Sequence, residues 1–300
     1  MDRFLKRFFC RAILVGCLVF PFWHTAEAKN TSSVVSSDHG ITVSPFLAKD
    51  ENGLLTLGNV RWGLKTKNPR NVPNDLREYH WQNAVLNPEM VDEIYYISRP
   101  FKPEAIAAHV FMVFTFRSGG FTGEDGFRPE GLVISYEALR KPGDPFNMWH
   151  GGMQRAYGIG CIMATWEDFV AVDCDLIGNR YLPNRLILSH EQKVALTRAS
   201  ILAGTRNLAG QKYHTLENNC ILNQLTQING VLPPAKRLKQ RVLNGRFINP
   251  LAPQPKFVPL FFIRKGIFEA RNVVIDVSNY FVPLNKLIHS SSIPSKTGSK

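Results

Sequence analysis

Continuous apolar runs occupy the middle of the chain and predict the strands of a sheet. Residues 105–116 are apolar at almost every position, as in a central strand covered on both faces. Ser118-Gly119-Gly120 supplies a turn that would end this strand. Further strands are expected over Gly131–Tyr136 and Tyr157–Thr165, with a weaker pattern over Arg185–Leu188.

Farther along the chain, the apolar spacing becomes that of helices. Ser189, with Gln192 three residues later, forms a capping-box sequence ahead of an apolar stripe. A second helix is expected to start at Asn218 or Asn219, because Asn is a strong N-cap, and to end at Asn229-Gly230.

This order of strands and helices predicts an α+β domain over residues 80–235. Residues 29 to about 50 are polar and Ser-rich, and turn signals such as Asn52-Gly53 follow, so we expect a leader and an irregular segment over residues 29–79. Residues 236–300 are expected to form a C-terminal extension that packs on the domain and ends in a disordered tail from Ser290.

The first 28 residues have the layout of a secretory signal peptide. A basic start up to Arg11 precedes an apolar run from Ala12 to Trp23, and Ala26-Glu27-Ala28 offers a small-x-small cleavage site. The run is shorter than the roughly 20 apolar residues of a membrane span. We therefore expect cleavage after Ala28 and a bacterial protein that is periplasmic or secreted.

A lipoprotein is the competing interpretation of the same segment. Leu14-Val15-Gly16-Cys17 resembles a lipobox, which would place a lipid anchor on Cys17. Few apolar residues precede this cysteine, however, and the apolar run continues beyond it. The pattern favours the soluble form.

The charge points to anionic partners. The net charge is +12, and little of it resides in residues 1–28. An anionic membrane surface or a cell-wall polymer would suit this excess, although solubility alone explains it equally well. Nucleic acid is not expected, because the protein is exported and no basic block with interleaved aromatic residues is present. Neither a cofactor nor a metal ion is expected, since the zinc-type His-Glu-x-x-His, Cys-x-x-Cys, P-loop and Gly-x-Gly-x-x-Gly motifs are missing from the sequence.

The cysteines suggest one unpaired thiol. Cys10 and Cys17 would leave with the signal peptide, so three of the five cysteines remain. Cys161 and Cys174 flank one strand–turn segment and could pair in an oxidising compartment. Cys220 would then be the free thiol.

Cys220 and His109 are the candidate catalytic pair. Cys220 falls in the first turn of the second helix, where free N–H groups and the helix dipole stabilise a thiolate. His109 lies in a strand otherwise without ionisable groups. Alone, each residue is more often an inert part of a core. A histidine in a central strand beside a cysteine at a helix start is also the layout of a papain-like thiol site in circularly permuted order.

A third polar group usually holds the imidazole in such a site. Ser135 and Glu137 alternate along the neighbouring strand and share one face, so either could point at His109. An exposed strand end is an equally good explanation of Glu137.

Four segments, taken in order, resemble the N-terminal periplasmic domain of the lipoprotein intramolecular transacylases (the Lnb-type domain). The resemblance covers about residues 80–230, and its most specific part is the Tyr-x-x-Leu-x-Asn-Asn-Cys stretch that ends at Cys220. The matching segments are Ala108–Phe114, Val133–Phe146, Tyr157–Thr165 and Tyr213–Asn223.

This resemblance implies a circularly permuted papain-like fold, similar to lecithin:retinol acyltransferase, with helices packed on an antiparallel sheet. It implies a Cys–His site acting on an acyl group, with Cys220 as nucleophile and His109 as base. Asn219 belongs to the Asn-Asn-Cys signature, and Tyr213 opens the same stretch. The transacylases carry membrane segments after this domain, whereas residues 231–300 contain none, which puts a lipoprotein substrate in doubt.

Three functions follow. The first is an exported acyltransferase or hydrolase acting on an envelope lipid or lipoprotein, with Asn219, Ser135, Tyr213 and a backbone N–H as supporting groups. The second is a cell-wall peptidase or amidase that uses the same thiol. The third is a non-catalytic envelope protein that binds lipid or a partner.

Overall fold

The structure is a computed structural model of the 300-residue chain, and it describes residues 35–101, 107–147, 153–215, 217–238, 257–269 and 273–290. These residues belong to one unit of the chain, Val34–Lys300. The expected signal peptide, its lipobox alternative and the expected tail after Ser290 lie outside the described residues.

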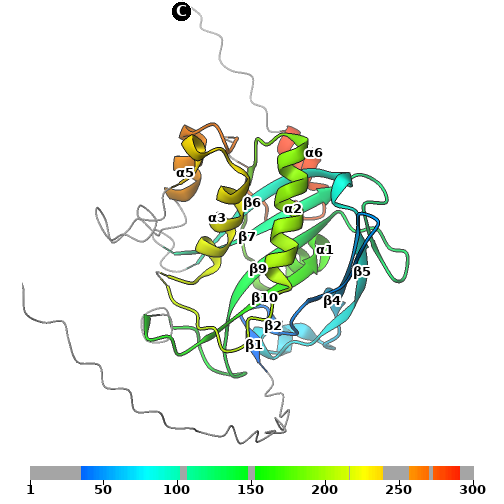
Figure 1. The fold of residues 1–300 in the computed structure, drawn as a ribbon. Coiled ribbons are helices and arrows are strands. Elements are labelled where there is room, and N and C mark those ends of the chain that lie inside the picture. The colour runs from blue at the N-terminus through cyan, green and yellow to red at the C-terminus, as the bar shows by residue number, and fades with distance from the viewer. Residues whose placement is uncertain are drawn as a thin grey trace, which may run out of the picture. The chain divides into compact units, whose positions relative to one another are not determined.

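Within the described residues, nine strands form one mostly antiparallel sheet in the order β11-β6-β7-β9-β10-β4-β5-β8, with β3 paired to β4 (Figure 1). The parallel pair in this sheet is β4 with β10. A separate hairpin joins β1 (Ser36–Ser37) to β2 (Gly40–Ile41). The sheet strands are β3 (Phe46–Glu51), β4 (Leu54–Leu64), β5 (Tyr79–Leu86), β6 (Val91–Pro100), β7 (Ala108–Phe116), β8 (Phe121–Gly123), β9 (Gly131–Leu139), β10 (Gly158–Thr165) and β11 (Leu182–Arg185).

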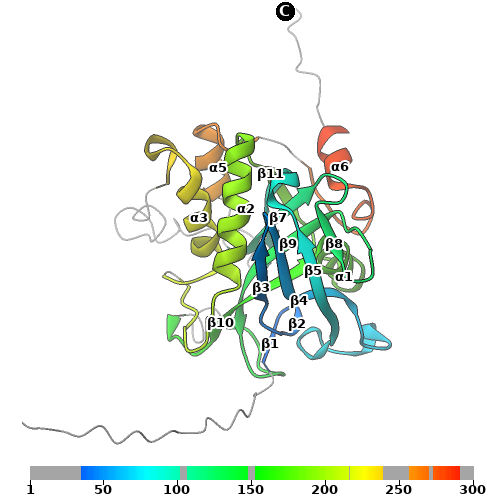
Figure 2. The same ribbon diagram turned by 45° about the vertical axis from the view of Figure 1, so that its right-hand side comes forward.

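Helices cover both faces of this sheet, as Figure 2 shows. The helices are α1 (Trp166–Val172), α2 (His190–Gly204), α3 (Cys220–Val231), α5 (Phe257–Arg264) and α6 (Leu284–Ser290). Short turns are η1 (Pro69–Asn71), η2 (Asn74–Leu76), η3 (Pro88–Met90) and η6 (Pro234–Lys236), and η5 (Asp173–Ile177) is π-helical. Among the described helices, none has both the length and the apolar character that crossing a membrane requires.

The core is divided into two layers by the sheet. One layer contains residues of α2, α3 and α5 packed against Val110, Met112 and other residues of the sheet. The other contains residues of α1 together with Phe111 and Val113. Because alternate side chains of β7 enter opposite layers, β7 is buried on both faces. The prediction of a doubly covered central strand, and of an α+β fold with a mostly antiparallel sheet, is confirmed.

Both predicted helix starts are confirmed. Ser189 and Gln192 form a complete capping box at the start of α2. Asn219 caps α3, because its side-chain oxygen accepts a hydrogen bond from the Leu222 N–H at 2.9 Å. Cys220 is consequently the first residue of α3.

Residues 35–79, the described part of the expected leader and irregular segment, are ordered and belong to the fold. β3 and β4 lie in this range and belong to the main sheet, and Leu55, Leu57 and Val60 of β4 are fully buried. Asn52 and Gly53, both with positive φ, form the two-residue turn that joins them. The turn signal therefore marks a hairpin, and the domain begins well before residue 80.

Two other expectations are corrected. The weaker strand expected over Arg185–Leu188 is shifted, since β11 ends at Arg185. The pairing of Cys161 with Cys174 is wrong, because both are free thiols. Cys161 packs in the core layer of α2 and α3, whereas Cys174 packs in the layer of α1, so the sheet separates them.

Candidate active site

A row of polar residues crosses the centre of the sheet at one end of its strands. Arg99 of β6 pairs with His109 of β7. β7 pairs with β9 so that Phe111 lies opposite Ser135. Two residues farther along, the same register places His109 opposite Glu137. Opposed residues on antiparallel strands share a face. The sheet therefore brings Arg99, His109 and Glu137 together on one face.

His109 is bound by both polar residues of β9. Its Nε2 lies 2.7 Å from Ser135 Oγ and 3.0 Å from Glu137 Oε1. Ser135 also donates a hydrogen bond of 2.5 Å to Glu137 Oε1. All three side chains are buried. Since Glu137 is enclosed in this way, it is not an exposed strand end.

Cys220 meets His109 in a small cavity of about 50 Å³. The cavity is lined by consecutive residues of β7 and of β9, whose side chains point to opposite faces of the sheet. It therefore lies at the end of these strands, where side chains from both faces meet. The side chains of His109 and Tyr213 line this cavity together with Cys220, and Cys220 raises the pKa of both. His109, Glu137, Tyr213 and Cys220 thus line one site.

The charges at this site reinforce one another. Burial lowers the pKa of His109, but Glu137 and Cys220 outweigh it and raise that pKa to about 10. Burial raises the pKa of Glu137, but His109 and a second histidine, His39, lower it to about 2. Burial and the neighbouring Cys220 raise the pKa of Tyr213 well above its usual value. The imidazolium and the carboxylate are the favoured forms, and the phenol stays protonated.

Asn219 fixes the start of α3 and with it the position of Cys220. Its side-chain nitrogen donates to the Thr215 carbonyl while its oxygen caps the Leu222 N–H. The side chain is committed to these backbone groups, so Asn219 supports the helix start rather than facing a reacting atom.

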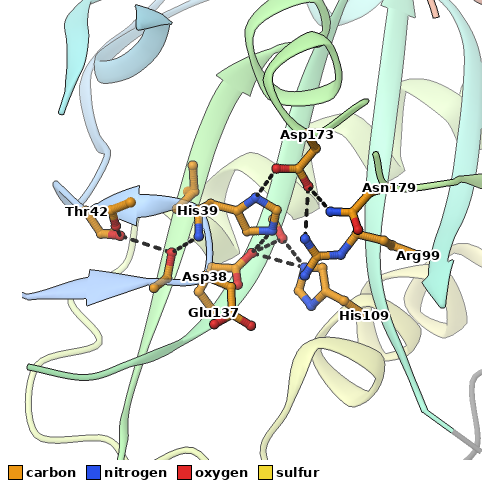
Figure 3. Close-up of polar contacts among 12 residues, drawn as sticks. Asp38, His39, Thr42, Arg99, His109, Glu137, Asp173 and Asn179 are labelled. Atoms are coloured by element: carbon orange, nitrogen blue, oxygen red, sulfur yellow. Dashed lines mark hydrogen bonds and ion pairs between the residues drawn. The ribbon is translucent and has the colours of Figure 1, made fainter. Parts of the chain in front are cut away.

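The sequence reasoning missed His39, which lies in the turn between β1 and β2. Its Nε2 is 3.6 Å from Glu137 Oε1, and its Nδ1 is 3.5 Å from Asp173 Oδ1 (Figure 3). The ring stacks on Phe169 with centroids 4.3 Å apart.

Asp173, at the start of η5, was missed as well. It accepts hydrogen bonds from Arg99 at 2.9 Å, Tyr181 at 2.6 Å and Asn179 at 3.3 Å. Although burial raises the pKa of Asp173, His39 and Arg99 lower it far below its usual value. Asp173 is therefore a fixed buried anion behind His39.

A sequence signal for His39 exists in the glycine that follows it. Gly40 has φ +97°, and a Cβ there would lie 2.7 Å from the Arg77 carbonyl oxygen. Only glycine suits this conformation and close approach. The His39-Gly40 pair within a Ser-rich stretch thus marks an ordered turn.

The same cluster contains residue types that bind metal ions. His39, His109 and Glu137 each offer one ligand atom within 4.8 Å of the others. Nε2 of His109, however, is already hydrogen-bonded to Ser135 and close to Glu137. We therefore interpret the cluster as a network of buried polar side chains.

A wider cleft adjoins the cavity of Cys220. Its volume is about 720 Å³, and Asp38, Arg99, Phe101 and Phe146 line both spaces. Most of its other lining residues are polar, namely Asn74, Asp75, Arg140, Asp144, Asn147 and Asn179. A substrate with polar groups could reach Cys220 from this side.

Comparison with known proteins adds no relative. No protein-family model, no curated protein and no solved structure matches the chain. The resemblance to the Lnb-type domain stays a prediction, and the residues of the site carry the functional argument.

Proposed function

We propose that the protein is a thiol-dependent acyl-transfer enzyme, a hydrolase or an acyltransferase, with Cys220 as nucleophile and His109 as general base. One observation carries the proposal: Cys220 and His109 line one small cavity, and buried contacts with Ser135 and Glu137 hold His109 there. A nucleophile, a base and a group that orients the base are the parts of such a site.

In the first half of the reaction, His109 takes the proton of the Cys220 thiol. Nε2 of His109 is bound to Ser135 and Glu137, which leaves Nδ1 as the ring nitrogen available to the thiol. The thiolate attacks the carbonyl carbon of an ester or amide, and the tetrahedral intermediate expels an alcohol or amine that His109 protonates. An acyl group is left as a thioester on Cys220.

In the second half, an acceptor restores the thiol. His109 removes a proton from water or from an amine, which attacks the thioester carbonyl and releases the acyl group. The proton then returns to the Cys220 sulfur. The backbone N–H groups of Cys220 and Ile221 precede the hydrogen-bonded turns of α3 and are candidates to stabilise the oxyanion, together with the Tyr213 hydroxyl.

The order of these parts along the chain supports a circularly permuted papain-like fold. The histidine strand β7 precedes the cysteine helix α3, which packs on β7. We further propose that the protein is exported through residues 1–28 and acts in the bacterial envelope on an acyl group of a lipid or lipoprotein, where its positive charge suits an anionic membrane surface.

A cell-wall peptidase or amidase is the second candidate. The polar character of the cleft beside Cys220 favours it, because a peptide offers polar groups along its length whereas a lipid chain does not. Both candidates use the same thiol and differ in the acyl donor.

Alkylation of the folded full-length protein tests the thiol chemistry. Iodoacetamide near pH 7, followed by peptide mapping, should label Cys220. Cys161 and Cys174 should stay unmodified, since burial raises the pKa of both, that of Cys174 to about 12. Cys220→Ser should remove the labelling, and His109→Ala should slow it by about 100-fold. His190→Ala, at a partly exposed position on α2, is the matched histidine control.

The donor is identified by incubating the protein with long-chain esters and with short cell-wall peptides and measuring the mass of Cys220. A long acyl group on Cys220 supports the lipid substrate, and a peptidyl group or peptide cleavage supports the peptidase. If Cys220 stays unlabelled in the folded protein, the catalytic proposal is wrong and the non-catalytic binding protein takes its place.

A further inference from the structure

We infer that His39, held by Asp173, is a positioning residue that keeps Glu137 ionised and aligned on His109. The inference rests on the proposed function and adds a second histidine and a second carboxylate to it. Cys220 and His109 line one cavity, and from His109 the contacts run through Glu137 and His39 to Asp173, as Figure 3 shows.

Each ring nitrogen of His39 faces a carboxylate oxygen. The distances are 3.6 Å to Glu137 and 3.5 Å to Asp173, and neither nitrogen has a hydrogen-bond partner of good geometry among the described residues. A neutral imidazole would turn a lone pair toward one of the two anions. Only the imidazolium, with a proton on each nitrogen, suits both.

The balance of buried charge leads to the same form. Arg99 contacts Asp173 at 2.9 Å and balances one of the two anions. An imidazolium at His39 balances the other, Glu137. The positive charge that His109 acquires from the thiol is then left to balance the Cys220 thiolate. Without a charge on His39, the same cluster would hold one excess negative charge beside the thiolate, which burial makes costly.

The protein fixes His39 from several sides. Arg61 of β4 donates to the His39 carbonyl at 2.9 Å and is itself paired with Asp168 of α1. Phe169 of α1 stacks on the ring. The charged and titratable groups around His39 are Glu137 from β9, His109 from β7, Asp173 from η5, and Arg61 with Asp168, which form a neutral pair. α1, β4 and η5 therefore fix the ring between the two anions.

The protonation of His39 is tested by NMR of the full chain labelled with ¹⁵N-histidine. At pH 6 we expect both ring nitrogens of His39 to give imidazolium signals, assigned by their loss in His39→Gln. In Asp173→Asn the Nδ1 signal should shift most. The ring signals of His109 should also move in His39→Gln, because Glu137 loses its second partner.

The effect on the thiol is tested through the pH profile of Cys220 alkylation. In His39→Gln we expect the rate near pH 7 to fall about tenfold and the acid limb of the profile to move up by about one pH unit, because a site that loses a positive charge gains a proton more readily. Thr42→Val is the matched control. It removes the hydrogen bonds of Thr42 Oγ1 to Gly40 O and Ser37 Oγ in the same turn but keeps the imidazole, so it should lower the melting temperature without moving the limb.

The outcomes separate the two proposals. An unreactive Cys220 in the unmodified protein removes the proposed function, while the NMR signals still decide the state of His39. A neutral His39 at pH 6, or an acid limb that moves equally in Thr42→Val, overturns the positioning role. One zinc ion bound per chain with loss in His39→Gln overturns it too, because the cluster would then be a metal site.

Discussion

Burial of a carboxylate is energetically unfavourable unless other groups stabilise its charge, as the neighbours of Glu137 do. The residue is 4 % exposed, and its side chain lies within reach of His109, His39 and Ser135. From the sequence, Glu137 fits a buried or an exposed strand end equally well. The choice depends on His39, which comes from a distant hairpin that no local pattern connects to β9.

The ionised form of Glu137 should make the stability of the protein fall in acid. Its pKa is lowered from 4.5 to about 2, so it contributes stability above pH 4.5 that is lost as the pH falls through 2. The shift corresponds to about 3 kcal/mol. Unfolding by urea should therefore show Glu137→Gln to be less stable than the unmodified protein at pH 6, with the difference narrowing toward pH 2.

The comparison needs a carboxylate that does not enter the cluster. Glu51, at the exposed end of β3, serves as control, and Glu51→Gln should leave the acid dependence of stability nearly unchanged. A constant difference between Glu137→Gln and the unmodified protein from pH 6 to pH 2 would show that Glu137 is not charged in the folded state.

At the scale of elements, the caps of the two long helices should contribute similarly to stability, but only one of them should affect the reactivity of Cys220. Asn219 caps α3 and Ser189 caps α2. Replacing either residue by Ala should lower the free energy of unfolding by about 1 kcal/mol, measured by chemical denaturation. Only Asn219→Ala should also slow the alkylation of Cys220, because the Asn219 cap fixes the first turn of α3. Equal alkylation rates in the two variants would show that the Asn219 cap does not position Cys220.

Elements whose signals are local were predicted well from the sequence. The caps at Ser189 and Asn219 and the apolar run of β7 need only neighbouring residues, and the structure confirms them. β4 and β6 were not predicted, because charged positions interrupt their apolar patterns. Arg61 of β4 is an example, since it is fully buried only because Asp168 of α1 pairs with it. Patterns along the chain cannot show such a distant partner.

At the scale of the whole molecule, the sheet divides the interior into two layers and decides which cysteines can meet. Cys161 and Cys174 lie in different layers, and Cys220, which packs in the layer of Cys161, is also a free thiol. Dithiothreitol should therefore leave the melting temperature of the full-length protein unchanged within error. A decrease of several degrees would reveal a stabilising disulfide, of the kind that is typically worth 2–4 kcal/mol. Alkylation after unfolding should find three free thiols at these positions.

The same sheet makes the N-terminal hairpins part of the folding unit. β4 lies between β10 and β5, and β5 otherwise pairs with β8 alone among the described strands. Removing residues before His80 would detach β5 and β8 from the sheet. It would also remove the buried side chains of Leu55, Leu57 and Val60 and expose the residues that they cover. Burial of each of these three side chains contributes about 1.5–3 kcal/mol. A whole domain is stable by only ~5–15 kcal/mol. A chain of residues 80–300 should therefore show no cooperative thermal unfolding by circular dichroism, whereas residues 35–300 should unfold cooperatively. Cooperative unfolding of both chains would mean that the domain does begin near residue 80, as the hydrophobic pattern alone suggested.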